Sequence, residues 1–454
     1  MPAAINAARV RCRLRSRNES GRPSGLAAGP GFVAMSQIVR QLTLSGTHCI
    51  LAVTADLAKR ALVLRRAVIA GYGIAGASIT FWLVRAGWEV TVVERAAAVR
   101  SSGGPVDVRG DAVAALRAMG CYEELRALST GATDVEFVDR AGRRIGGFAI
   151  EPSRSNGDFE IARQDLAEGL ARAAGGARIL WGDSIVDARQ DGDGVDATLA
   201  SGVLIRSDVL IAADGLHSDV RRLVVAPEDA AVAPLGMWIA TLRYPAAGMD
   251  PHTVRVYNEP GRLAAVHPAG GHPGAALMLR APAPQGRDLR DLDNQKAFLA
   301  GEFAGSGWHV PDILAHVARA DDLYFDAVIR VRVRRWWSGR VVLLGDAASS
   351  VTIFGDGSSM AIVGAWELAK ALERHAEVAA AFVAYERAQR KHVVPRQRLV
   401  QLAAHFLVPA SAAGLSARNA VLRAGGWFSR RGAGQAALDG NPAESTTTPG
   451  RRAR

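Results

Sequence analysis

The sequence predicts an α/β fold in which a helix-flanked, mostly parallel sheet is interleaved with an α+β region on a mostly antiparallel sheet, plus C-terminal helices. Three observations predict it. Short apolar runs at residues 67–70, 209–212 and 341–344 each lead into a glycine or an Asp-Gly pair, as buried parallel strands do. Residues 225–335 are richer in proline and carry alternating segments. Helical patterns of mixed charge fill residues 379–407.

Ordered structure is predicted to begin at Arg66, with a unit of strand, tight turn, helix and strand. Glycines end the predicted helices, because a left-handed residue commonly closes a helix. In chain order we expect a strand at 67–70, a helix at 75–86, a strand at 88–94, helices at 111–119 and 163–174, short strands over 178–212 with a hairpin turn at 191–194, a strand at 341–344, and helices at 358–374 and 379–407.

Composition narrows the class of protein. The 454 residues are 49% hydrophobic and 22% charged, which is typical of a soluble globular chain of more than one lobe. The net charge is +11, but residues 1–66 carry +9 of it and residues 425–454 carry +3, so the body is almost neutral and no nucleic-acid partner is expected. No apolar run reaches about 18 residues, so no membrane span is expected.

The three cysteines, Cys12, Cys49 and Cys121, form no C-x-x-C pair and have no histidine at metal-ligand spacing. The sequence therefore predicts neither a metal site nor a disulfide framework. A reducing, cytoplasmic compartment fits this cysteine usage.

The loop after the first strand matches G-x-G-x-x-G. In such a loop the first glycine turns the chain, the second lets backbone N–H groups approach a pyrophosphate, and the third lets the helix pack on the strand. The helix start adds unpaired amides and a positive dipole end. We therefore predict that a dinucleotide contacts Gly71, Gly73, Ile74, Ala75 and Gly76.

Glu94 ends the second strand, where its carboxylate can accept hydrogen bonds from both ribose hydroxyls of an adenosine. The same charge would repel a 2′-phosphate, so the dinucleotide is expected to be FAD or NAD rather than NADP. Arg95 follows directly and either covers the adenine or is simply solvated.

Two segments far downstream favour FAD. Asp346 follows Gly345 directly after a strand, where its carboxylate can accept a hydrogen bond from a ribityl hydroxyl. Gly355 and Gly357 precede an apolar helix whose first amides could face the pyrimidine edge of a flavin and stabilise the negative charge gained on reduction. Asp214, which begins an Asp-Gly turn, marks the second of three segments, between the glycine loop with Glu94 and residues 341–357. Each segment alone is also compatible with a plain turn or a capped core helix.

In this order and at this separation, the three segments resemble those of the class A flavoprotein monooxygenases, the para-hydroxybenzoate hydroxylase-like aromatic hydroxylases, over about residues 66–410. The resemblance implies that the first loop holds the ADP part of FAD. It also implies that Asp214 lies near the pyrophosphate and that Asp346 contacts the ribityl chain.

Two arginines enter through the same resemblance. Arg163, in Ile-Ala-Arg-Gln-Asp-Leu, looks like the family's arginine that reaches FAD from a helix start. Arg109, in Pro-Val-Asp-Val-Arg-Gly, lies in a segment similar to the one near the isoalloxazine in the branch that includes the tetracycline-modifying monooxygenases. Either arginine could instead be salt-bridged at the surface.

The resemblance implies an FAD-dependent monooxygenase. NAD(P)H would reduce the flavin without a second nucleotide-binding domain, and O2 would form a C4a-hydroperoxide that hydroxylates an aromatic or polyketide-like small molecule. The protein would be a monomer or homodimer. No catalytic side chain is assigned from the sequence. The candidates nearest to these segments in the sequence are His217, His267 and His272, and each is more typical of a structural or exposed position.

The chain departs from the family pattern in one place. The family has a His and then a Pro between Gly-Asp-Ala and the glycine pair, and residues 348–354 have neither. FAD binding is still expected despite this departure, but the expectation of hydroxylation is weaker. A non-hydroxylating FAD reductase or dehydrogenase, a flavin-dependent halogenase (whose W-x-W-x-I-P pattern is absent at Trp336 and Trp337) and an FAD-binding protein without turnover stay open.

The regions expected from these patterns are a basic, disordered or dispensable extension at 1–65, a discontinuous Rossmann-like FAD-binding domain at 66–224 and 336–378, a substrate domain at 225–335, C-terminal helices at 379–424 and a disordered tail at 425–454.

Overall fold

The computed structural model describes residues 65–99, 103–150, 156–267, 272–282, 284, 288–350 and 355–424. All of them belong to one compact unit of the chain. The expected extension up to residue 64, the expected tail at 425–454 and residues 351–354 of the third segment lie outside the described residues.

The described helices are α2 (Ile74–Arg85), α3 (Asp111–Met119), α4 (Tyr122–Ala127), α5 (Arg163–Ala173), α6 (Asp219–Val224), α7 (Leu292–Glu302), α8 (Val310–Arg319), α9 (Gly357–Arg374), α10 (Val378–Leu407) and a last helix at Ala412–Ala424, with short 3₁₀ turns η2 (Pro227–Asp229) and η3 (Gly345–Ala347). The strands are β1 (Arg66–Ala70), β2 (Glu89–Glu94), β3 (Val106–Val108), β4 (Asp134–Val138), β5 (Arg144–Ala149), β6 (Phe159–Ile161), β7 (Arg178–Trp181), β8 (Ile185–Gln190), β9 (Val195–Leu199), β10 (Leu204–Ser207), β11 (Val209–Ala212), β12 (Ala230–Arg243), β13 (Thr253–Glu259), β14 (Arg262–His267), β15 (Gly274–Arg280), β16 (Tyr324–Val333), β17 (Trp337–Ser338) and β18 (Val341–Leu343).

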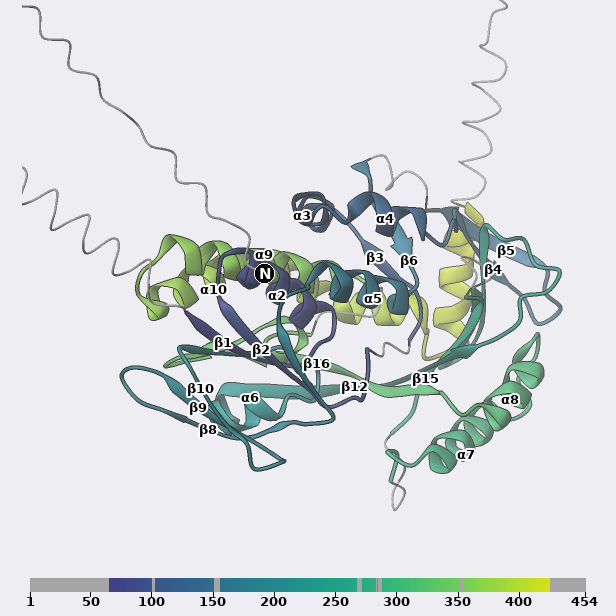
Figure 1. Ribbon diagram of the computed structural model, residues 1–454. Helices are drawn as coiled ribbons and strands as arrows, with labels where there is room; N and C mark the ends of the chain where they lie inside the picture. The colour runs from purple at the N-terminus through teal and green to yellow at the C-terminus, as the bar shows by residue number, and fades with distance from the viewer. Residues whose placement is uncertain are drawn as a thin grey trace, which may run out of the picture. The chain divides into compact units, whose positions relative to one another are not determined.

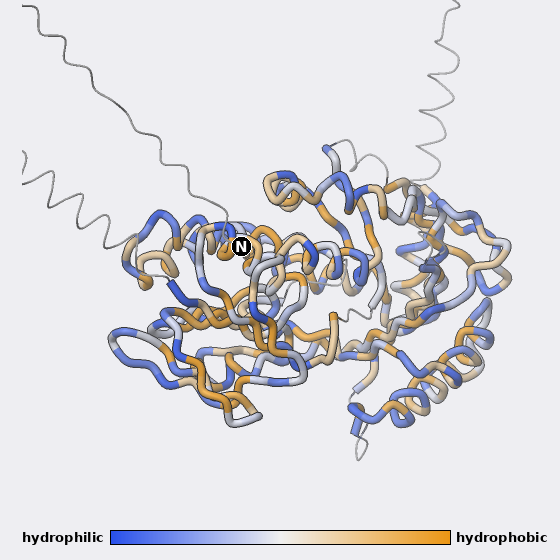
Figure 2. The backbone as a smooth tube through the Cα atoms, in the orientation of Figure 1, coloured by the Kyte–Doolittle hydropathy of each residue, from blue (hydrophilic) through white to orange (hydrophobic). Residues whose placement is uncertain are grey.

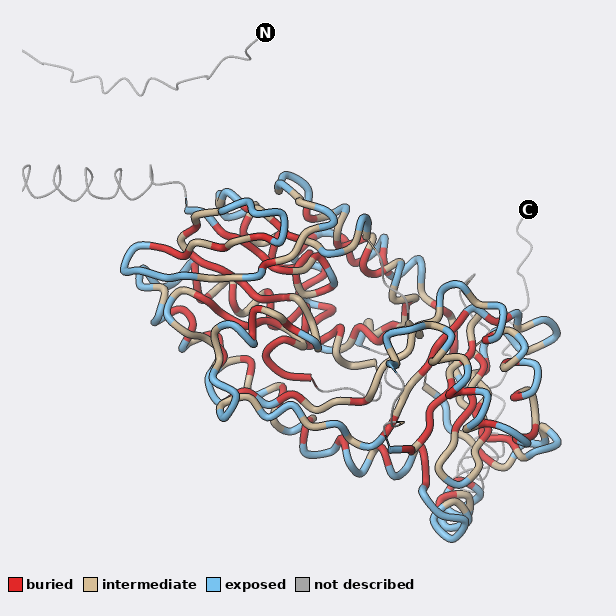
Figure 3. Tube along the Cα trace, turned by 90° about the horizontal axis from the view of Figure 1, so that it is seen from below, coloured by how far each residue is buried: buried red, intermediate tan, exposed pale blue. Residues whose placement is uncertain are grey.

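A six-stranded sheet forms the first half of the fold, in the order β17-β18-β11-β1-β2-β7. Neighbours from β18 to β7 are parallel, and β17 is antiparallel to β18. The predicted apolar runs become its central strands, and every residue of β11 and β18 is buried. Figure 2 shows these strands in orange, and Figure 3 shows the same region as mostly buried. Helix α9 packs between α2 and α10 (Figure 1).

A seven-stranded sheet forms the second half, in the order β16-β12-β15-β14-β13-β4-β5. All its pairs are antiparallel except β13 with β4. The α/β class with a parallel sheet, a mostly antiparallel sheet and C-terminal helices is thus confirmed. The antiparallel sheet also takes in β4 and β5, which precede residue 225, so the boundary drawn there separates strands of one sheet.

Helices α7 and α8 lie against this second sheet (Figure 1) and bury its aromatic residues. The Trp238 ring stacks on Phe325 with ring centroids 5.3 Å apart, and the Tyr244 hydroxyl donates to Asp312 at 2.5 Å. These aromatic side chains therefore belong to a packed core.

The described residues include two C-terminal helices, α10 and the last helix. No single helix there is long and apolar enough to cross a bilayer, and the only pair that passes together, Val378–Leu407 with Ala412–Ala424, is bent by 96°.

Candidate functional site

The glycine loop between β1 and α2 has the geometry that its pattern predicts. Gly71 has φ +91°, and a Cβ there would lie 2.6 Å from the Ala213 carbonyl oxygen. A Cβ on Gly76 would lie 2.0 Å from the carbonyl oxygen of Gly71, whereas one on Gly73 would meet nothing within 4 Å. The first and third glycines thus let the chain close on itself, and the second faces open space beside the start of α2. Ile74 and Ala75 form the first turn of that helix.

Glu94 is held beside this loop at the end of β2. Its Oε2 accepts from the backbone N–H of Tyr72 at 2.7 Å, and its Oε1 accepts from that of Ala96 at 2.8 Å. Each carboxylate oxygen has a further lone pair, so the fixed carboxylate can still accept from a ribose diol. Arg95 is exposed at the strand end.

The Asp214 side chain forms hydrogen bonds within its own turn. Its Oδ1 accepts from the Ser218 hydroxyl at 2.5 Å and its Oδ2 accepts from the Val220 N–H at 3.1 Å, at the start of α6. Ser218 in turn caps α6 by accepting from the Arg221 N–H. Burial raises the pKa of Asp214, and these donors oppose that shift. Asp214 therefore shapes the Asp-Gly turn.

Arg221 joins the second segment to the third. Its side chain is buried, and its guanidinium donates to the carbonyl oxygens of Ala347 at 3.0 Å and Leu216 at 2.7 Å. Sequence reasoning assigned it no role. The available signal is its position in the helix that follows the Asp-Gly turn, since an arginine there can reach back across the neighbouring strand end.

Asp346 stands at the carboxyl end of β18 in η3, after Gly345 with φ +62°. Burial raises the pKa of its carboxyl group, and the charges of Arg163 and Arg221 lower it. Within the described residues this carboxylate accepts no hydrogen bond. A carboxylate with unused acceptor capacity at the carboxyl ends of parallel strands lies where ligands of such sheets bind, and it fits a donor such as a ribityl hydroxyl.

The two predicted arginines differ. Arg163 begins α5, and its charge acts on the carboxyl group of Asp346 and on Tyr324, so its charge lies near the third segment. Arg109 forms an ion pair with Asp107 at 2.8 Å, and its side chain is 41% exposed. The salt bridge considered for Arg109 therefore forms.

The start of α9 is tied to β3. The hydroxyls of Ser358 and Ser359 each donate to the Asp107 carbonyl oxygen at 2.8 Å, and the Asp107 N–H donates to the Gly355 carbonyl at 3.4 Å. Gly357 is the first residue of α9. These bonds fix Gly355 and Gly357 beside the β3–β6 ribbon, so the helix start is preorganised to present its amides.

A polar line that the sequence analysis missed runs from β3 into the antiparallel sheet. Asp107 stands opposite Glu160 in the β3–β6 pair, and Glu160 Oε2 contacts His267 Nε2 at 2.8 Å. His217 similarly faces Asp326 at 3.1 Å, and His272 lies 3.5 Å from Asp165. Each of these three histidines therefore has a carboxylate partner, and no local sequence pattern predicts these pairings.

Asp107→Asn should stabilise the protein near neutral pH and have little effect in acid. Burial raises the pKa of Asp107 to about 6, against an ordinary 3.8. The unfolded chain loses this proton first, so the contribution of Asp107 to stability falls as the pH rises from about 4 to about 6, by at most about 3 kcal/mol. Denaturant unfolding of both apoproteins at each end of that window measures the difference.

The matched control is Asp139→Asn, because Asp139 has a partly exposed carboxyl group whose pKa is lowered by hydrogen bonds donated by Arg143. A lowered folded pKa stabilises above the unfolded value and is lost in acid, so this variant should change stability in the opposite direction. An Asp107→Asn effect of equal size at both ends of the window would contradict the assignment.

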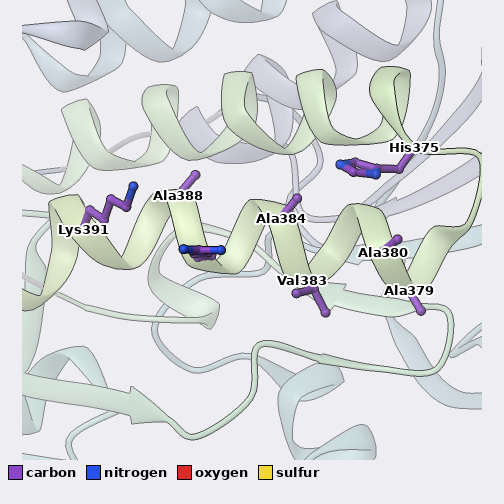
Figure 4. A pocket seen from close by; sticks show the side chains of 8 residues that line it. His375, Ala379, Ala380, Val383, Ala384, Ala388 and Lys391 are labelled. Atoms are coloured by element: carbon purple, nitrogen blue, oxygen red, sulfur yellow. The ribbon is translucent and has the colours of Figure 1, made fainter.

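A separate groove of about 590 Å³ runs along α10 (Figure 4). Alanines, Val383 and three basic side chains line it, and none of its residues belongs to the three segments: His375, Ala379, Ala380, Val383, Ala384, Arg387, Ala388 and Lys391. The glycine loop, Asp346 and the start of α9 therefore define the candidate site, and this groove is not part of it.

Comparison with known proteins shows the family of this chain. The FAD binding domain family model matches residues 65–396. A flavin-dependent monooxygenase of Legionella longbeachae is 30% identical over 349 residues, which cover 75% of this chain and 89% of the relative. The chain belongs to the class A FAD-dependent monooxygenase family.

Solved structures of this family share the fold. The tetracycline destructase Tet(51) aligns with a TM-score of 0.70 and 28% identity, over 80% of this chain and 96% of that one. Klebsiella pneumoniae HpxO, complexed with FAD and uric acid, aligns with a TM-score of 0.63 at 22% identity, which supports the fold alone. This monooxygenase family member is thus an FAD-dependent oxidoreductase.

Proposed function

We propose that this protein hydroxylates an aromatic or polyketide-like small molecule, with NAD(P)H as the reductant and O2 as the oxidant. In balance, the substrate, O2, NAD(P)H and a proton give the hydroxylated product, water and NAD(P)+. The observation that carries the proposal is the Asp346 carboxylate, which is half-buried at the strand end and has no hydrogen-bond partner in the described chain.

The residues present fit FAD. Gly71 and Gly76 let the loop close on itself, Gly73 leaves it open to a pyrophosphate, and the α2 amides of Ile74 and Ala75 add donors to it. Glu94 would hold the adenosine ribose, with exposed Arg95 beside it. Asp346 and Arg163 would contact the ribityl chain and its phosphates. The further proposed contacts are Asp214, which orders its own turn, and Arg109, Gly345, Gly355 and Gly357 around the start of α9.

Bound FAD supplies the redox chemistry, and the chain positions groups and excludes water around it. We propose that the substrate binds where β12 and β16 approach the FAD part. There a Cβ on Gly104 would contact the Thr241 methyl at 3.7 Å, and Tyr324 lies within the field of Arg163 and Asp346. The Thr241 hydroxyl is buried without a partner in the described residues, so it is free to bond a substrate oxygen.

The family and the likeness to the tetracycline destructase support the proposed substrate class. We propose phenols and fused-ring polyketides, whose electron-rich rings accept an electrophilic oxygen atom. The enzyme would act in a reducing, cytoplasmic compartment, as a monomer or a homodimer.

The decisive experiment follows NAD(P)H oxidation and O2 consumption together over a panel of phenols and polyketides. We expect a substrate that speeds both rates equally and gains 16 mass units as a hydroxylated product, the mass of one oxygen atom. Equal NAD(P)H turnover without O2 would instead support a non-hydroxylating reductase, which the absent His and Pro at residues 348–354 favour. Protein that takes up no FAD would overturn both.

A further inference from the structure

A second cavity, of about 310 Å³, lies between the antiparallel sheet and the C-terminal part of α10. We call it the arginine cavity. Strands β12, β15 and β16 and helix α10 supply its lining: Ala233, Pro234, Leu235, Arg280, Arg330, Gln401, Ala404 and His405.

An irregularity in the sheet lies at this cavity. The register of β12 against edge strand β16 shifts between Pro234 and Trp238. Pro234 has no N–H to donate, so a proline at this place is tolerated only beside such a bulge or at a sheet edge. The bulge changes the course of β12 next to Arg330, which is paired with Ala233.

The charge of the arginine cavity is one-sided. No carboxylate lines it, and neither Arg280 nor Arg330 forms an ion pair within the described residues. Arg280 donates through Nε to the Val408 carbonyl at 2.7 Å, and one of its terminal nitrogens is buried without a partner in the same part of the chain. Burial lowers the pKa of Arg280 without an opposing acid. Two partly buried guanidiniums without a counter-charge are unfavourable until an anion joins them.

The cavity is distinct from the proposed FAD and substrate sites. Side chains alternate along a strand, so Arg330, Val328 and Asp326 share one face of β16. Val328 packs there with buried Met237 and Met278, and this apolar cluster fills the face between the cavity and the end that carries Thr241. A ligand in the cavity would therefore not contact the three FAD segments.

We propose that the arginine cavity binds a small organic carboxylate. The guanidiniums of Arg330 and Arg280 match a carboxylate in shape and charge, and the Gln401 amide adds a donor. The apolar lining of Pro234, Leu235 and Ala404 favours an anion with a hydrocarbon body over a bare inorganic ion. This site goes beyond the proposed oxygenation, because none of its residues serves FAD.

The test is calorimetric titration of the FAD-loaded full chain with sodium benzoate at constant ionic strength. Arg330→Gln should weaken binding by about tenfold or more, since a charged hydrogen bond is lost. The matched control is Arg332→Gln, which removes the same charge from an exposed position two residues along the strand. It should change the affinity by less than about twofold. The flavin absorbance spectrum should not respond to benzoate.

Each other result overturns the assignment. Equal weakening by both variants would show general charge attraction. A flavin spectrum that changes with benzoate, with binding insensitive to Arg330→Gln, would place benzoate at the proposed substrate site. Inorganic phosphate binding as tightly as benzoate would show an unselective anion site, and no binding would refute a ligand role. If Arg330→Gln does not fold, Ala233→Glu, which places a carboxylate beside Arg330, should abolish benzoate binding.

Discussion

Asp346→Ala should lower FAD affinity by about 10- to 100-fold and leave the apoprotein at least as stable as the wild type. The two effects have one cause. The Asp346 side chain is half-buried, this partial burial raises the pKa of its carboxyl group, and it accepts no hydrogen bond within the described residues, so the folded apoprotein gains little from it. A ribityl hydroxyl would supply the missing donor, and the substitution removes that bond.

Fluorescence titration of the apoprotein with FAD gives the affinity, and denaturant unfolding gives the stability. Asp214→Ala is the instructive contrast, because Ser218 and Val220 already donate to that carboxylate and its removal should destabilise the apoprotein. Asp193→Ala, in the exposed β8–β9 turn, should change neither quantity. If Asp346→Ala kept FAD, or lost stability as Asp214→Ala does, Asp346 would be a structural residue and not a cofactor ligand.

The sequence alone predicted those parts of the fold and the candidate site whose residues lie close together along the chain. The glycine loop, the strand before it and Glu94 lie within one strand–helix–strand unit, so backbone requirements alone select glycine at residues 71 and 76. The buried runs of β11 and β18 were visible for the same reason, since strands covered on both faces are uniformly apolar.

Contacts between distant segments were not visible in this way. Arg221 reaches Ala347, and Glu160 reaches His267, across separations of more than 100 residues. The sequence around Arg221 or Glu160 does not predict the partner of either residue, because the pairing is set by how strands are ordered in the sheets. The same limit explains β4, whose five residues read as part of the first region and yet pair with β13.

The two arginines show the limit within a single resemblance. Both lie in segments that resemble the family, yet the charge of Arg163 acts on Asp346 while Arg109 pairs with the neighbouring Asp107. The difference lies in Asp107, two residues before Arg109 on β3, whose burial favours a counter-charge. A motif match thus indicated the neighbourhood of each arginine and not its partner.

Gly76→Ala and Gly73→Ala should separate folding from cofactor binding within one loop. A methyl on Gly76 would lie 2.0 Å from the Gly71 carbonyl oxygen, so α2 would have to move away from β1, at about 3 kcal/mol or more. A methyl on Gly73 meets nothing within 4 Å, and φ is −72°, so stability should change by less than about 1 kcal/mol.

The effect on FAD affinity should be clearest for Gly73→Ala, because that variant should remain folded. The open space beside Gly73 is where a pyrophosphate would approach the first amides of α2, so its methyl should weaken FAD binding by about tenfold or more in a protein that remains folded. Gly192→Ala is the matched control, because a methyl in that hairpin also meets nothing within 4 Å. Unfolding curves and FAD titrations of the three variants give both quantities. A Gly73→Ala protein that binds FAD like Gly192→Ala would mean that the space beside the loop is not the pyrophosphate site, whatever its pattern.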